Sequence, residues 1–146
     1  MKTIVLTWFA IFHFTFSHSQ SKITLPKYYD GVGIIFEKEQ AKNFLISQVD
    51  TFFTPTIDQV ESFEKSLQFL HCSNSALKKY YRQYLGFIKN NSQYLMIYFM
   101  NFKNKRLANE NFKNYENEML FGLGDFYARN AFLYRFNIQA KTIGNY

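Results

Sequence analysis

Residues 80–102 read YYRQYLGFIKNNSQYLMIYFMNF, and this stretch decides the fold class. Two segments rich in aromatic and branched side chains, 80–89 and 93–102, flank the trio Asn90-Asn91-Ser92. Aromatic and branched residues favour strands, whereas asparagine and serine favour tight turns. The stretch therefore predicts a β-hairpin.

A helical pattern lies upstream of this hairpin. Residues 54–56 (Thr-Pro-Thr) are typical of a helix start, and apolar residues then recur every three or four positions. We expect a helix over 55–71 that buries one face and leaves Asp58, Glu61 and Glu64 on a solvated face. The apolar stripe consists of Ile57, Val60, Phe63, Leu67 and Leu70.

Shorter segments on either side predict further elements. Residues 20–30 contain Pro26 and predict an extended lead-in, whereas 31–36 predict a short strand. Residues 44–46 fit a second strand or the inner face of a short helix, and we prefer the strand. Residues 103–115 are rich in Asn, Lys and Glu and predict a solvated loop, with one irregular helical turn as the alternative for part of it. Three more strands are expected, at 118–123, 126–138 and 142–146.

One long helix followed by a strand meander predicts an α+β roll, in which an antiparallel sheet of about four to five strands covers the helix. This layout resembles the cystatin-like, cone-shaped folds. Three runs, Phe53 to Glu64, Tyr80 to Gly86 and Gly122 to Tyr127, are similar to a group of small exported bacterial proteins of unknown function. That resemblance implies no established activity and no functional residues.

The first nineteen residues predict export. Lys2 supplies a positive charge, residues 4–16 are largely apolar, and residues 17–19 place small side chains at a cleavage junction. The apolar run is shorter than the roughly 18 to 20 residues of a membrane span. We therefore expect 1–19 to be a cleaved signal peptide, without a permanent membrane anchor, and 20–146 to be a single periplasmic or extracellular domain.

Motifs for catalysis, metals and cofactors are sparse. Cys72 is the single cysteine of the sequence, so no internal disulfide can form. His71 precedes it, but neighbouring residues on a helix point about 100° apart, which disfavours a nucleophile and base pair. Residues 122–124 (Gly-Leu-Gly) lack the third glycine of a dinucleotide fingerprint. The sequence predicts no catalytic residue, no metal and no cofactor.

Positive charge is the main indication of a partner. The net charge is +6, which favours anionic surfaces in general. Positive charge gathers in the predicted loop, with further basic residues expected nearby, and a solubilising surface is the preferred explanation of this charge. The loop residues are Lys103, Lys105, Arg106 and Lys113, and the expected neighbours are Lys78, Lys79 and Arg82. The candidate contacts with a partner or ligand are Arg82, Lys103, Lys105, Arg106, Arg129 and Arg135. The expected partner is an envelope or extracellular protein or an anionic glycan, and not a nucleic acid.

Two classes of function fit these observations. The preferred one is an exported, non-enzymatic binding module. The alternative is a small ligand-binding or hydrolytic domain with a cavity between helix and sheet. A concave, partly polar cavity of several hundred cubic ångströms lined by the sheet would favour the alternative, whereas a helix that fills the sheet with Phe and Leu would favour the binding module.

Overall fold

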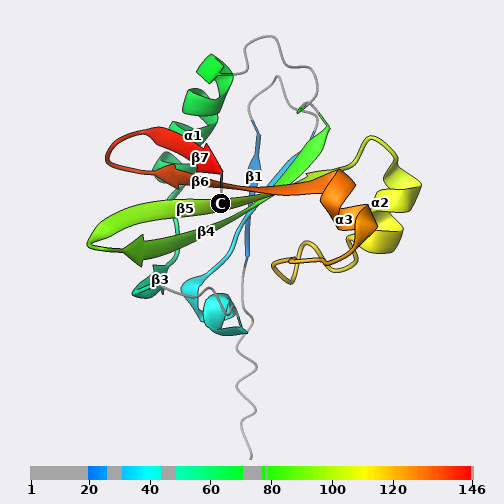
Figure 1. The fold of residues 1–146 in the computed structure, drawn as a ribbon, viewed down its shortest axis with the longest axis horizontal. Coiled ribbons are helices and arrows are strands. Elements are labelled where there is room, and N and C mark those ends of the chain that lie inside the picture. Colours follow the sequence, from blue (N-terminus) through cyan, green and yellow to red (C-terminus); the bar gives the residue numbers. More distant parts are fainter. Residues whose placement is uncertain (1–19, 26–30, 44–48, 71–76, 78, 146) are drawn as a thin grey trace, which may run out of the picture.

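The protein forms one mixed β-sheet with helices on both of its faces. A computed structural model describes residues 20–25, 31–43, 49–70, 77 and 79–145. Within these ranges the fold class is α+β, with seven strands and three α-helices (Figure 1). The strands are β1 (Ser21–Thr24), β2 (Val32–Ile35), β3 (Thr51–Phe53), β4 (Tyr80–Lys89), β5 (Ser92–Asn101), β6 (Ala131–Asn137) and β7 (Thr142–Asn145). The helices are α1 (Ile57–Leu70), α2 (Lys105–Asn111), α3 (Asp125–Asn130) and the short 3-10 helix η1 (Lys38–Asn43).

The β4–β5 hairpin lies at the centre of the sheet, whose order is β1-β2-β4-β5-β6-β7, with β3 pairing with β4. Its turn consists of Asn90 and Asn91, which both have positive φ angles (50° and 59°). Asparagine tolerates this conformation, which suits a two-residue hairpin turn. β3 pairs with β4 so that Phe53 lies opposite Gly86. The missing side chain of Gly86 leaves room for the Phe53 ring.

The predicted sheet is correct in kind but wrong in number of strands and in direction. β2 pairs with β4 in parallel, whereas all the other pairs are antiparallel. The parallel pair arises because η1, β3 and α1 lie between β2 and β4 in the chain, and such a crossover is what a parallel pair requires. β1 and β3 are strands that the sequence did not predict.

Helix α1 covers one face of the sheet. Val60, Phe63 and Leu67 are fully buried there. The Phe63 ring packs edge-on against the ring of Phe136, with centroids 5.6 Å apart. Figure 1 shows α1 behind β6 and β7, away from α2 and α3. One predicted member of the apolar stripe is wrong, because Ile57 is 56% exposed.

The opposite face of the sheet is covered by η1, α2, α3 and the segment that follows α2. α2 and α3 lie side by side at one end of the sheet (Figure 1), where the rings of Phe112 and Phe126 are 5.2 Å apart. Gln83 reaches from β4 into the segment that follows α2. Its Nε2 donates hydrogen bonds to the carbonyls of Tyr115 (2.6 Å) and Glu118 (2.8 Å), and its Oε1 accepts one from the Leu120 N–H (2.8 Å).

These hydrogen bonds explain why the strand predicted at 118–123 is wrong. Two of that segment's backbone groups pair with the Gln83 side chain instead of with a neighbouring strand. The strand predicted over 126–138 is also only partly correct, since its first residues belong to α3 and β6 starts at Ala131. The turn before α3 contains Gly124, whose φ of 100° suits glycine.

Other predictions vary in outcome. The hairpin, the strand within 31–36 and the strand near the C-terminus are confirmed, and the predicted helix is confirmed with a later start, at Ile57. Residues 103–115 hold a complete helix, α2, because the Asn104 side chain accepts a hydrogen bond from the Leu107 N–H (3.2 Å) and caps its start. The lead-in 20–30 contains β1. The segments 1–19 and 44–46 lie outside the described residues.

Candidate functional site

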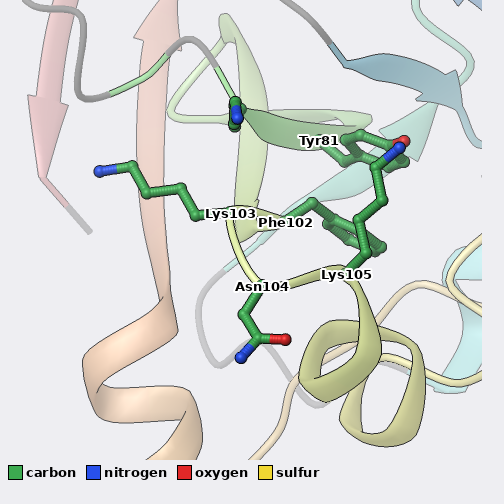
Figure 2. Close-up of a pocket in the computed structure, with 6 residues that line it drawn as sticks. Tyr81, Phe102, Lys103, Asn104 and Lys105 are labelled. Carbon is green, nitrogen blue, oxygen red and sulfur yellow. The ribbon is translucent and has the colours of Figure 1, made fainter.

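A hollow of about 630 Å³ opens where β4 begins and β5 ends, on the sheet face opposite α1. Figure 2 shows the side chains around it. They come from the start of β4, from the connection after β5 and from the first residue of α2. The lining residues are Lys79, Tyr81, Phe102, Lys103, Asn104 and Lys105.

Backbone hydrogen bonds position the lysines of this hollow. The Phe102 N–H donates to the Lys79 carbonyl at 2.9 Å, which continues the pairing of β4 with β5 beyond the strand ends. The Lys103 N–H donates to Oδ1 of Asn101 at 3.0 Å. The Asn104 cap then starts α2 at Lys105. Hydrogen bonds therefore fix the backbone at or beside all three lysines.

Aromatic rings form the floor of the hollow. Tyr81 stacks on Phe102 with centroids 3.9 Å apart and planes at 11°. Tyr115 packs against both rings, at 5.5 Å and 5.2 Å, and its hydroxyl donates to Oε1 of Glu116 at 2.9 Å. Burial, this hydrogen bond and nearby charge raise the pKa of Tyr115. The floor is a packed aromatic cluster that keeps the shape of the hollow.

Charge in the hollow is of one sign. Lys79, Lys103 and Lys105 are exposed, and within the described ranges none of them forms an ion pair. No carboxylate is among the lining residues. In Figure 2, Lys105 extends along the Tyr81 side of the hollow and Lys103 extends away on the opposite side. The arrangement can attract an anionic group that reaches the space between these side chains.

The remaining candidate contacts lie elsewhere. Arg106 is on α2 and pairs with Glu110 at 2.8 Å, and Arg129 is on α3 and pairs with Asp125 at 3.8 Å. Arg135 is on β6 and lines a separate hollow. The structure thus brings together Lys103 and Lys105, with Lys79 as their neighbour. The aromatic floor was not predicted, although extending the hairpin register past Tyr80 and Asn101 would have placed Lys79 beside Phe102.

Arg82 lies inside the protein and not on its surface. Its side chain is 0% exposed, and its Nε is 3.0 Å from Oε1 of Glu64, which is 2% exposed. The Tyr84 hydroxyl donates to the same Oε1 at 2.7 Å, and the Arg82 guanidinium lies 4.8 Å from the centroid of the Phe99 ring. Arg82 is therefore out of reach of a partner in this conformation.

The burial of Glu64 corrects the predicted solvated face of α1. Burial raises the pKa of Glu64, and the Arg82 charge and the Tyr84 hydrogen bond lower it in part. Its Oε2 has no hydrogen-bond partner among the described residues. Arg82 is the physical reason that a glutamate can lie between α1 and the sheet, because it supplies the opposite charge there.

The described parts of the chain contain no group of three or more His, Cys, Asp or Glu side chains placed to hold a metal ion. His71 and Cys72 lie outside the described residues. Among the helices that the structure describes, none is both long and apolar enough to cross a membrane.

Comparisons with known proteins give no relative, since no protein-family model, no curated protein and no solved structure matches this chain.

Proposed function

We propose that this protein is an exported, non-enzymatic binding module that holds an anionic group of an envelope or extracellular partner between Lys79, Lys103 and Lys105. One observation supports this most: these three lysines surround one hollow and have no ion pair within the described ranges. In this proposal the domain is a cystatin-like roll, enlarged by β1, β3 and the short helices of the second face.

The lysines favour an anion because they repel one another. Like charges repel one another, and an anion placed between the three ammonium groups offsets this repulsion by its attraction to each of them. Exposed charges are screened over about 8 Å at physiological salt. Binding through this hollow is therefore expected to weaken as the salt concentration rises.

The interior of the domain gives less support to the alternative function. A ligand-binding or hydrolytic domain would need a cavity between α1 and the sheet. Phe63 lies there instead, with the rings of Tyr84 and Phe99 each 6.3 Å away. Leu67 is 0% exposed in the same cluster. This close packing favours a binding module that uses its outer surface.

The test measures binding to immobilised heparin, a model acidic glycan, by surface plasmon resonance at several salt concentrations. The triple variant Lys79→Gln/Lys103→Gln/Lys105→Gln is expected to bind at least tenfold more weakly and with a smaller salt dependence. The matched control Lys38→Gln/Lys65→Gln/Lys141→Gln has the same net charge and is expected to stay within twofold of the unmodified protein. Equal losses in both variants would show that net charge alone is responsible.

Export is tested separately. Mass spectrometry of the protein recovered from its own cells should give a chain that starts at Gln20. A chain that still carries Met1 would refute the cleaved signal peptide.

A further inference from the structure

A second hollow, of about 320 Å³, lies at the other end of the sheet. It is formed by the start of β5, the end of β6 and β7. Arg135 pairs with Met96 on one side and with Gly144 on the other. Side chains alternate along a strand and Phe136 faces α1, so Arg135 is on the opposite face of the sheet. The hollow lined by Lys79, Lys103 and Lys105 (the lysine hollow) opens on this same face. The lining residues are Tyr94, Arg135, Asn137, Thr142, Ile143 and Gly144.

The surroundings of Arg135 fit recognition of a planar anion. Its side chain is exposed and forms no ion pair in the described part of the chain. It runs across Gly144, where an added Cβ would lie 3.4 Å from its Nε and 3.8 Å from its Cγ. Tyr94 beside it is held by stacking on Phe87, with centroids 5.1 Å apart. An accessible guanidinium in a supported position suits the two oxygens of a carboxylate.

Neutral polar groups accompany this guanidinium. Oδ1 of Asn137 accepts a hydrogen bond from the Ala140 N–H at 2.8 Å, which leaves the amide NH2 of Asn137 as a donor. Thr142 adds a hydroxyl and Tyr94 adds a phenol. A carboxylate flanked by hydroxyl groups, as in an acidic sugar, matches these donors and acceptors.

The two hollows are far enough apart to need an extended ligand. Tyr94 and Phe102 mark them, and they are eight residues apart along β5 and its continuation. A strand rises about 3.3 Å per residue, so the separation is about 26 Å. The strand between the hollows is itself covered, since Met96, Tyr98 and Met100 are buried, so a ligand would pass over the covering segment and this separation is a lower bound on its path. In that segment Phe121 is 40% exposed and lies against Tyr98, with centroids 5.6 Å apart. A ligand that reaches both hollows is therefore a chain of several sugar units, and a short oligosaccharide can occupy only one of them.

We propose that Arg135 forms a second subsite, and that one linear polysaccharide carrying carboxylates occupies this subsite and the lysine hollow together. This inference rests on the proposed function, because the lysine hollow is one of the two contacts. Binding at the first hollow makes the second contact intramolecular, which raises the affinity for a chain that is long enough. The affinity should therefore depend on the length of the ligand and not only on its charge.

The test uses oligogalacturonates of two, four and eight units as probes, with titration calorimetry and nuclear magnetic resonance of the full protein. The unmodified protein is expected to bind the eight-unit chain at least tenfold more tightly than the four-unit chain. Arg135→Gln should remove this increase while binding of the two-unit chain at the lysine hollow stays within twofold. The control Lys65→Gln, on α1 across the sheet, should retain the increase.

Two further comparisons separate the effect of charge from that of the paired donors, and a polysaccharide from another polyanion. Arg135→Lys keeps the charge but not the paired donors, and it is expected to recover only part of the increase. An undiminished increase in Arg135→Gln would overturn the second subsite while leaving the lysine hollow intact. Loss of two-unit binding only in the lysine triple variant supports the proposed function by itself. Poly-glutamate of the same charge that binds as tightly, with the same dependence on Arg135, would overturn the assignment to a polysaccharide.

Discussion

The buried pair of Arg82 and Glu64 gives the sharpest prediction about stability. It joins β4 to α1 at 3.0 Å, with exposed fractions of 0% and 2%. Arg82→Met would leave the Glu64 carboxylate buried, with the hydrogen bond from the Tyr84 hydroxyl as its remaining polar contact among the described residues. Breaking a buried pair by removing one partner costs about 3 to 5 kcal/mol. We expect a loss of that size in the free energy of unfolding at pH 8.

The pH dependence of this loss follows from the same contacts. Arg82 lowers the pKa of Glu64, and its removal leaves burial to raise that pKa further. A carboxyl group that binds a proton no longer carries a buried charge. The loss caused by Arg82→Met is therefore expected to shrink as the pH falls from 8 towards 5.

Removing the whole network should be tolerated. The side chains of Arg82, Glu64 and Tyr84 form one buried polar network. The variant Arg82→Met/Glu64→Leu/Tyr84→Phe leaves none of its charges and no unpaired hydroxyl in the core. Replacement of a buried ion pair by apolar residues of similar size is neutral or stabilising by about 1 to 4 kcal/mol. We expect the triple variant to be at least as stable as the unmodified protein.

The assay is urea denaturation followed by circular dichroism, with the free energy obtained by linear extrapolation. Arg106→Met is the matched control, because Arg106 pairs with Glu110 at 2.8 Å but the two side chains are 78% and 52% exposed. Exposed pairs contribute about 0.2 to 1 kcal/mol. A loss below about 1 kcal/mol in Arg82→Met at pH 8 would refute the reasoning, since it would mean that the pair is not shielded from water.

Three other measurements test the core. Because the pKa of Glu64 is raised, the folded state binds its proton more tightly than the unfolded state does. The free energy of unfolding should therefore fall as the pH rises from about 4.5 through the folded pKa. Glu64→Gln should remove this pH dependence of stability in urea titrations. Burial, opposed in part by the hydrogen bond to the Gly122 backbone, raises the pKa of Tyr98 to about 12. Ultraviolet titration should therefore show one phenol, absent in Tyr98→Phe, that ionises near that pH, and an ordinary pKa would contradict the packing of this ring. Phe63→Ala should cost about 3 to 5 kcal/mol in denaturation, whereas Leu123→Ala, at a residue 93% exposed, should change stability by less than about 0.5 kcal/mol.

Local patterns in the sequence predicted the elements whose contacts are local. The β4–β5 hairpin and α1 each show a clear period over ten residues or more. β1 and β3 have four and three residues, too few to show a period. The partners of β3 also lie far along the chain, as Thr51 with Ile88 shows. A single sequence read in windows does not contain these pairings.

The first turns of the 126–138 segment were mispredicted because aromatic residues favour strands. Phe126 and Tyr127 instead lie on α3, where both rings pack against Phe112 at 5.2 Å and 5.7 Å. The Tyr127 hydroxyl also donates to the Asn111 carbonyl at 2.7 Å. These tertiary contacts outweigh the local preference for a strand.

For the candidate site, composition was enough to predict that Lys103 and Lys105 contribute to a basic surface. Composition did not distinguish Arg82 from the exposed basic residues, because its burial depends on its pairing with Glu64. One signal was present in the spacing: Glu64 follows Val60 by four residues and precedes Leu67 by three, which places all three on the same helix face. A carboxyl group on the buried face of a helix needs either a cation from another element or a bound proton.

The parallel pairing of β2 with β4 also bears on the route by which the chain folds. Ile34 has to find Gln83 across the whole of η1, β3 and α1, whereas the two-residue turn brings β4 and β5 together at once. Contacts between distant residues form late because loop closure must come first. We therefore expect the central hairpin to form first, and β1 and β2 to join its edge later. Weakening β2 should accelerate unfolding and leave the refolding rate nearly unchanged.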